Sequence, residues 1–191
     1  MRSFLLLASV IAGAGLSAAD PLPGGFRGAH WGDPLSAIMI SAPDLELGRT
    51  ATAVSGECLL AERPFRFVYS GANGMLDRGM YVHDAHHIDS NDDVAVFDAI
   101  KALLTEKYGA PASNHELWSN ELFKGDRSKL GTALAIAAVV LRAQWSDGKN
   151  AIILQAKGKN TVIAVTVTYG RFHEVMAHTV SADDSADRKK L

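Results

Sequence analysis

Residues 139–169, VVLRAQWSDGKNAIILQAKGKNTVIAVTVTY, decide the fold. From Leu141 to Trp145 apolar and polar residues alternate, which is the period of a β-strand with one buried face. Two turn-forming runs, Asp147-Gly148 and Gly158-Lys159-Asn160, separate this strand from two further apolar runs. The stretch therefore predicts a three-stranded antiparallel meander with Trp145 in the core. The expected strands cover residues 139–145, 152–157 and 162–169.

The segment before the meander predicts the longest helix. Apolar residues recur at 3.6-residue spacing over residues 92–108, as they do on the buried face of an amphipathic helix. Gly109 and Pro111 are typical of a helix end. Residues 128–140 favour helix in their first part and strand from about Val139. The apolar stripe comprises Val94, Phe97, Ile100, Leu104 and Tyr108, reinforced by Val96 and Leu103.

The N-terminal half shows the same order on a smaller scale. Asp33-Pro34 is typical of a helix start, so we expect a short helix over residues 34–40. Alternation over residues 57–69 and 76–82, joined by the turn-forming run 70–74, predicts an antiparallel hairpin. The expected fold is α+β, with an antiparallel sheet and helices packed on one face. Two tandem helix-plus-hairpin units are the alternative.

The N-terminus has the features of a secretory signal peptide. Arg2 provides a positive charge, an apolar run follows, and Ser17 and Ala19 are the small residues of a cleavage site before Asp20. We therefore expect an exported protein, periplasmic or secreted. The expected organisation is a signal peptide at residues 1–19, a single α+β domain at 20–180 and a polar flexible tail at 181–191.

The composition excludes several classes of protein. The 191 residues carry a formal net charge of −2, so we expect no nucleic-acid partner. Hydrophobic residues make up 48% of the chain, as in ordinary globular proteins. No later segment is apolar for long enough to be a transmembrane helix. The single cysteine, Cys58, excludes an intramolecular disulfide, and its apolar neighbours favour a buried thiol.

The densest group of metal-binding side chain types lies in HDAHHID, residues 83–89, between the hairpin and the long helix. Imidazole and carboxylate groups are good ligands for zinc, copper and nickel. No established zinc-binding spacing is present, and a solvated loop leading into a helix is the simpler interpretation. We expect no resident cofactor. If the segment binds zinc, copper or nickel, the candidate ligands are His83, Asp84, His86, His87 and Asp89.

Several residues near turns and strand ends are candidates for contact with a partner protein. Tryptophan is frequent at the centres of protein interfaces, although in a glycine-flanked turn it also serves as a core residue. Both interpretations apply here. The candidate contact residues are Phe26, His30, Trp31 and Trp118.

The segment Phe26-Arg27-Gly28-Ala29-His30-Trp31-Gly32 resembles the start of many small secreted bacterial proteins, which share an F-x-G-x-x-W-G turn before a short helix. The element order, with Tyr108-Gly109-Ala110-Pro111 closing the second helix, is similar to two further groups. These are the small lipoprotein of the outer-membrane β-barrel assembly machinery, whose lipoprotein cysteine this chain lacks, and the β-lactamase inhibitor protein. The resemblance implies a small exported α+β protein that binds other proteins, and it assigns no residue a role.

The sequence contains no signature of a known catalytic site. It has no G-x-S-x-G elbow, no P-loop and no dinucleotide fingerprint. The leading hypothesis is therefore a non-enzymatic binding module whose partner is an envelope or secreted protein. A metal-binding protein or metal-dependent enzyme using His83, His86 and His87 is the second hypothesis. A carrier of a small molecule or lipid is the third.

Overall fold

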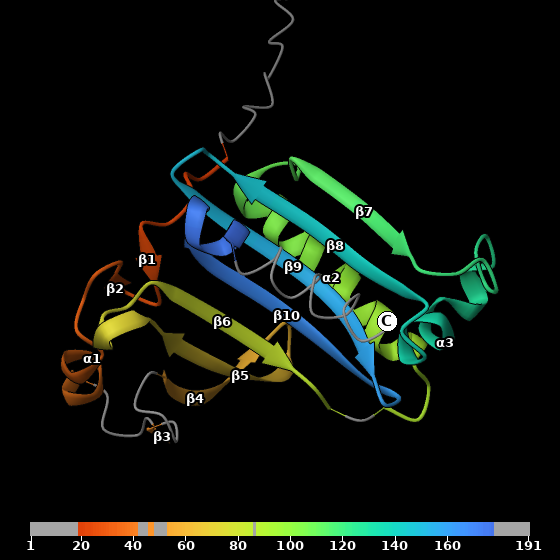
Figure 1. Ribbon diagram of the computed structural model, residues 1–191, viewed down its shortest axis with the longest axis horizontal. Helices are drawn as coiled ribbons and strands as arrows, with labels where there is room; N and C mark the ends of the chain where they lie inside the picture. Colours follow the sequence, from red (N-terminus) through yellow and green to blue (C-terminus); the bar gives the residue numbers. More distant parts are fainter. Residues whose placement is uncertain (1–18, 42–45, 48–52, 86, 178–191) are drawn as a thin grey trace, which may run out of the picture.

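The computed structural model describes residues 19–41, 46–47, 53–85 and 87–177. Most of the expected signal peptide, His86 and the expected tail lie outside these residues. Eight strands form one antiparallel sheet in the order β3-β4-β5-β6-β10-β9-β8-β7 (Figure 1). The strands are β3 (Glu46–Leu47), β4 (Ala53–Leu60), β5 (Arg63–Ser70), β6 (Arg78–His83), β7 (Ser113–Trp118), β8 (Val139–Ser146), β9 (Asn150–Lys159) and β10 (Val162–Arg171).

Helices and a small hairpin accompany the sheet, so the predicted α+β fold is confirmed. The α-helices are α1 (Leu35–Ser41), α2 (Asn91–Tyr108) and α3 (Leu130–Ala135), and the two short 3₁₀ turns are η1 (Ala72–Gly74) and η2 (Arg127–Lys129). The hairpin pairs β1 (Gly25–Phe26) with β2 (Ala29–His30). Within the described residues, no helix has the length and apolar character needed to cross a membrane.

The predicted meander is present as β8, β9 and β10, and Trp145 is 2% exposed in the core. One of its turns differs from the prediction. Gly158 lies inside β9, and the turn falls at Asn160-Thr161, whose φ angles are 52° and 65°. Gly158 serves packing instead, because a Cβ atom there would lie 1.8 Å from the backbone oxygen of Leu134 at the end of α3.

The single strand predicted over residues 57–69 is wrong. The chain reverses at Ala61-Glu62, so this segment contributes the end of β4 and most of β5. Both turn residues have left-handed φ angles, 50° and 60°. Neither alanine nor glutamate is typical of such a turn, so the sequence carried no signal of it. The following hairpin, β5 with β6, is confirmed.

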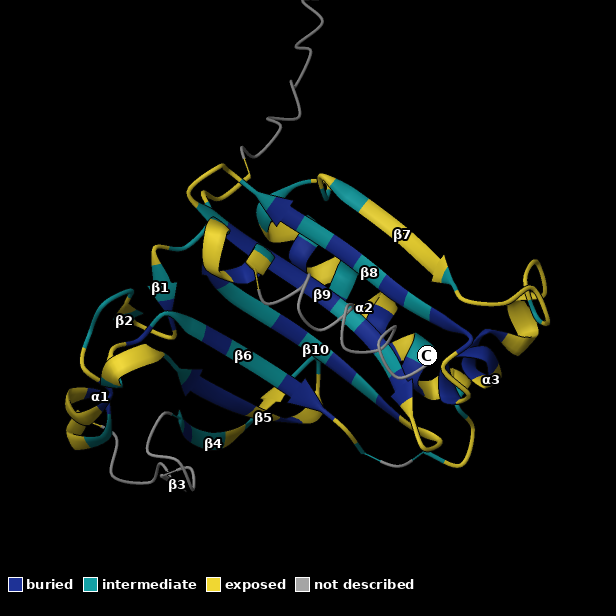
Figure 2. Cartoon of the chain, in the orientation of Figure 1, coloured by how far each residue is buried: buried dark blue, intermediate teal, exposed yellow. Residues whose placement is uncertain are grey.

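The main core lies between the sheet and the helices α2 and α3. Val96, Phe97, Ile100 and Leu104 of α2 are buried there, while Leu103 is 43% exposed and lies outside the apolar stripe, contrary to prediction. A second cluster lies under α1 on the same face of the sheet, since its Phe67 and Tyr69 follow Phe65 of the main core at two-residue intervals along β5 and therefore point to the same side. Figure 2 shows the buried strands at the centre of the sheet and exposed residues along β7.

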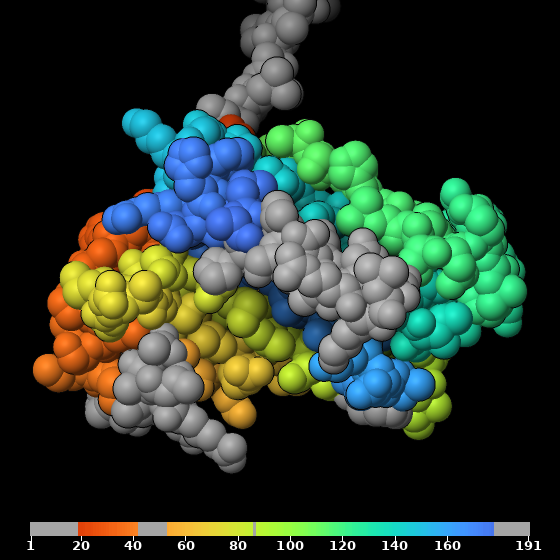
Figure 3. Space-filling view, viewed as in Figure 1, coloured from red at the N-terminus to blue at the C-terminus, as the bar shows by residue number. Residues whose placement is uncertain are grey.

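One helical segment packs on the opposite face, which corrects the expectation that all helices share a face. Residues 172–177 follow β10 and bury Val175 against Ala151 and Ile153 of β9. These two residues alternate with Ile152 and Leu154, which belong to the main core. In the space-filling view this blue segment adjoins the orange surface of the N-terminal residues (Figure 3).

The order of elements divides the sheet into two similar halves. Each half begins with a helix, α1 or α2, and continues through four strands that each pair with the next, β3–β6 or β7–β10. The last strands of the two halves, β6 and β10, pair with each other. This element order agrees with the alternative of two tandem units, with four-stranded meanders in place of the expected hairpins.

Candidate metal centre

Buried polar side chains gather where the first half of the sheet passes into α2. His83 is the last residue of β6, and Asp93 lies in the first turn of α2. They are 2% and 3% exposed, and they are the buried polar or charged residues of the described chain. Because burying such groups without partners costs free energy, their contacts decide what the site can do.

His83 is oriented by a backbone carbonyl. Its Nδ1 atom lies 2.8 Å from the oxygen of Pro64 on β5, and its ring packs beside Phe65 with 5.1 Å between centroids. A carbonyl oxygen only accepts hydrogen bonds, so Nδ1 carries the proton and Nε2 presents a lone pair. No described residue forms a hydrogen bond with this Nε2 atom, although it is fully buried.

His87 is oriented in a corresponding way by a carboxylate. Its Nδ1 atom donates to Oδ1 of Asp93 over 2.8 Å, and its side chain is 18% exposed. The carboxylate oxygen accepts, so Nδ1 of this ring also carries a proton. In the neutral ring the remaining nitrogen, Nε2, is therefore available as a ligand.

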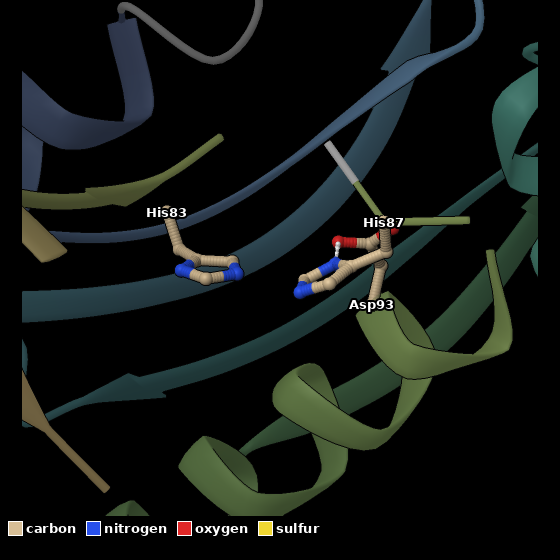
Figure 4. Close-up of side chains that lie close together, drawn as sticks. All are labelled: His83, His87 and Asp93. Atoms are coloured by element: carbon tan, nitrogen blue, oxygen red, sulfur yellow. Dashed lines mark hydrogen bonds and ion pairs between the residues drawn. The ribbon is translucent and has the colours of Figure 1, made fainter. Parts of the chain in front are cut away.

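The two rings turn these remaining nitrogens toward each other (Figure 4). Their centroids are 5.3 Å apart, and the ring planes differ by 26°. One ligand atom from each of His83, His87 and Asp93 lies within 4.8 Å of the others. A histidine that binds a metal usually donates its other N–H to a carboxylate or carbonyl, and both rings have that partner here.

Contacts at the start of α2 fix the position of Asp93. The amide of Asn91 donates to Ser128 O and accepts from the backbone N–H of Gly131, which joins α2 to the start of α3. The helices meet closely there, since a Cβ atom at residue 131 would lie 2.4 Å from the carbonyl carbon of Ser90. The first turn of α2 is thus held by two segments that are distant in sequence.

The structure brings together only part of the predicted ligand set. His83 and His87 meet, whereas Asp84 lies 3.9 Å from Arg66, and Asp89 accepts the backbone N–H of Asn91. His86 lies outside the described residues. Asp93 was not among the predicted ligands, because an acidic residue in the first turn of a helix needs no further explanation. Its spacing from Phe97, Ile100 and Leu104 places it on the buried stripe of α2, and that was the available signal.

The four candidate contact residues do not form one surface. Phe26, the second residue of β1, is 3% exposed and is unavailable for contact, which corrects that expectation. Trp31 is half-buried and donates from Nε1 to Asn150, whereas His30 is exposed beside Asp33. Trp118 lies on the far edge strand β7 and donates to Glu116. The protein-interaction hypothesis stays a prediction.

Cys58 is half-buried, not fully buried as its neighbours suggested. Burial raises the pKa of its thiol, and the nearby guanidinium of Arg27 opposes that change. Arg27 itself lies over the ring of Phe67, 4.0 Å from the centroid. The net rise in pKa leaves less reactive thiolate at neutral pH, so the local chemistry favours an inert thiol.

A hollow of about 270 Å³ lies between α2 and the strands β7 and β8. Charged side chains of Lys101, Glu116 and Arg127 line it, and the last two form an ion pair. Such a lining does not favour an apolar ligand. The hypothesis of a small-molecule or lipid carrier stays a prediction.

Comparisons with protein-family models, with curated proteins and with solved structures find no match for this chain. The fold therefore defines its class, an α+β protein with one antiparallel sheet. Any functional conclusion has to come from the site.

Proposed function

We propose that this chain is an exported protein that binds a divalent transition-metal ion between His83 and His87. The observation that carries the proposal is the orientation of the two imidazoles. Each ring uses Nδ1 to donate to an oxygen, and each turns its other nitrogen toward the second ring. A buried nitrogen lone pair without a hydrogen-bond donor is stabilised when a cation occupies the space before it.

The ligand types favour zinc, copper or nickel. Imidazole suits these ions, whereas magnesium and calcium prefer oxygen. Asp93 would act mainly through His87, because a carboxylate that accepts from the far ring nitrogen orients the ligand and makes it more basic. Two imidazoles leave further coordination positions for water or for a group from another molecule.

The direct test is zinc binding by the purified protein without a histidine tag, after treatment with a chelator. Titration with Zn²⁺ alone, read by calorimetry, should show one ion per chain. His83→Gln and His87→Gln should each weaken binding about 100-fold or more, and Asp93→Asn about 10–100-fold. Zinc should also raise the melting temperature of the wild type and not of the two histidine variants.

His115→Gln is the matched control, because His115 is an exposed histidine on β7, away from the site. It should bind zinc as the wild type does. Equal binding by the wild type and by a folded His83→Gln/His87→Gln double variant would refute the proposal. So would a wild type that binds no zinc, copper or nickel.

A further inference from the structure

We propose that the peptide bond between Ala19 and Asp20 is a processing site, and that the fold binds the amino group released there at the C-terminus of α2. The inference is independent of metal binding. It rests on contacts of the first described residues with the end of that helix.

The backbone nitrogen of Asp20 lies at the end of α2. It donates to the carbonyl oxygen of Lys107 over 2.8 Å. The last carbonyl groups of a helix have no partner within the helix, and they carry its partial negative charge. Two more contacts close this end: Gly109, with φ of 80°, donates to Thr105 O, and Nε1 of Trp145 donates to Gly109 O.

The residues after Asp20 hold it in this position. Leu22 packs against the main core. Asp20 and Leu22 also line a hollow of about 280 Å³ with Tyr108 and Trp145. On the other side of the bond, Ala19 also lies close to the end of α2, since a Cβ atom at residue 109 would lie 3.3 Å from the Cβ atom of Ala19. The contact is therefore anchored by apolar packing on the C-terminal side of the cleavage site.

Cleavage changes the chemistry of this contact. Hydrolysis of the Ala19–Asp20 bond by a signal peptidase consumes one water molecule, leaving a carboxylate on Ala19 and an amino group on Asp20. At neutral pH most of that group is protonated, so one N–H donor becomes a positive group with three donors. A positive charge is stabilising at a helix C-terminus.

Among the described residues, the charged groups that line this hollow are the carboxylates of Asp20 and Asp147, and the titratable phenol of Tyr108 lines it too. Lys107, whose carbonyl oxygen is the acceptor, adds an opposing positive charge on α2. The favourable charge interaction exists only after cleavage. The processed chain is thus more stable than its precursor. The charge interaction at the C-terminus of α2 is added only when the signal peptide is removed during export.

The test uses the chain exported and purified from the periplasm, in the presence of a chelator. Mass spectrometry of the intact product should place its N-terminus at Asp20. The product is then acetylated at its α-amine, with the site confirmed by peptide mass. Acetylation removes the positive charge and keeps one N–H donor, so a difference in melting temperature between the free and the acetylated form reports the effect of the charge. The free form should melt about 1–4 °C higher at pH 7.

At about pH 10 an α-amine has lost its proton, and the two forms should melt at the same temperature. Equal melting temperatures at pH 7 would overturn the proposed charge interaction. A product that begins at another residue would overturn the assigned processing site.

Discussion

At the scale of single residues, Gly158 shows that a glycine needed for close packing can be mistaken in the sequence for a glycine that forms a turn. It belongs to the run Gly158-Lys159-Asn160, which is typical of a turn, yet it lies within β9, where the strand passes against the end of α3. The absence of a side chain lets the carbonyl of Leu134 approach the strand. The actual turn uses Thr161 at a φ angle that β-branched residues rarely adopt.

We expect Gly158→Ala to lower the free energy of unfolding by about 2–3 kcal/mol, because the new Cβ atom would collide with the backbone of α3. Urea unfolding followed by tryptophan fluorescence measures this change. Gly24→Ala is the control, since a Cβ atom at Gly24 meets nothing within 4 Å. If both variants unfold at the same urea concentration as the wild type, Gly158 has no packing role.

At the scale of elements, α2 contains apolar residues that are buried in the core and others of the same type that are exposed to solvent. Ile100 is 2% exposed and Leu103 is 43% exposed. Ile100→Ala should lower the free energy of unfolding by about 3 kcal/mol through lost burial and a cavity. Leu103→Ala should change it by less than about 0.5 kcal/mol. Thermal unfolding of the two variants provides the measurement, and comparable losses would contradict the assignment of the buried face.

The sequence predicted the elements whose periodicity is strong and local. The meander and α2 follow from alternation and from 3.6-residue spacing, because each pattern repeats over many residues. The reversal at Ala61-Glu62 was missed because neither residue favours a left-handed conformation. Short-range sequence patterns also could not predict on which face of the sheet residues 172–177 lie, because the face is determined by their contact with Ile153, which is distant in the sequence.

The candidate site was only half predictable for the same reason. His83 and His87 are close in the sequence, so their types and spacing were visible. The carbonyl of Pro64 comes from β5 and Asp93 from α2, and their approach depends on how β6 leads into that helix. Composition alone could not distinguish Asp93 from the neighbouring acids of the helix start, whereas its burial does.

At the scale of the whole molecule, a partly buried tyrosine links folding to alkaline pH. Burial raises the pKa of the Tyr169 phenol far above its usual range, and the nearby Tyr108 and Tyr81 raise it further. The folded chain therefore keeps a proton that the unfolded chain releases above about pH 10. The resulting stability is complete below that pH and is lost as the pH rises above it.

We expect the free energy of unfolding to fall above pH 10, with Tyr169 contributing up to about 1.4 kcal/mol per pH unit. Urea titrations between pH 8 and pH 11 measure this slope. Tyr169→Phe removes the titrating group and keeps the ring, so its slope should be smaller by that amount. A variant with the slope of the wild type would show that Tyr169 does not control the alkaline limit.

The edge position of β7 has a consequence for self-association. This strand ends the sheet, pairs only with β8 within the described chain, and is exposed over most of its length. The outer side of an edge strand is a template on which another extended chain can add. Glu116 and Arg127 place an ion pair beside it, and charge of this kind discourages such addition. Growth of ordered aggregates from the native protein is therefore expected to begin along β7, and to become easier when salt screens that pair.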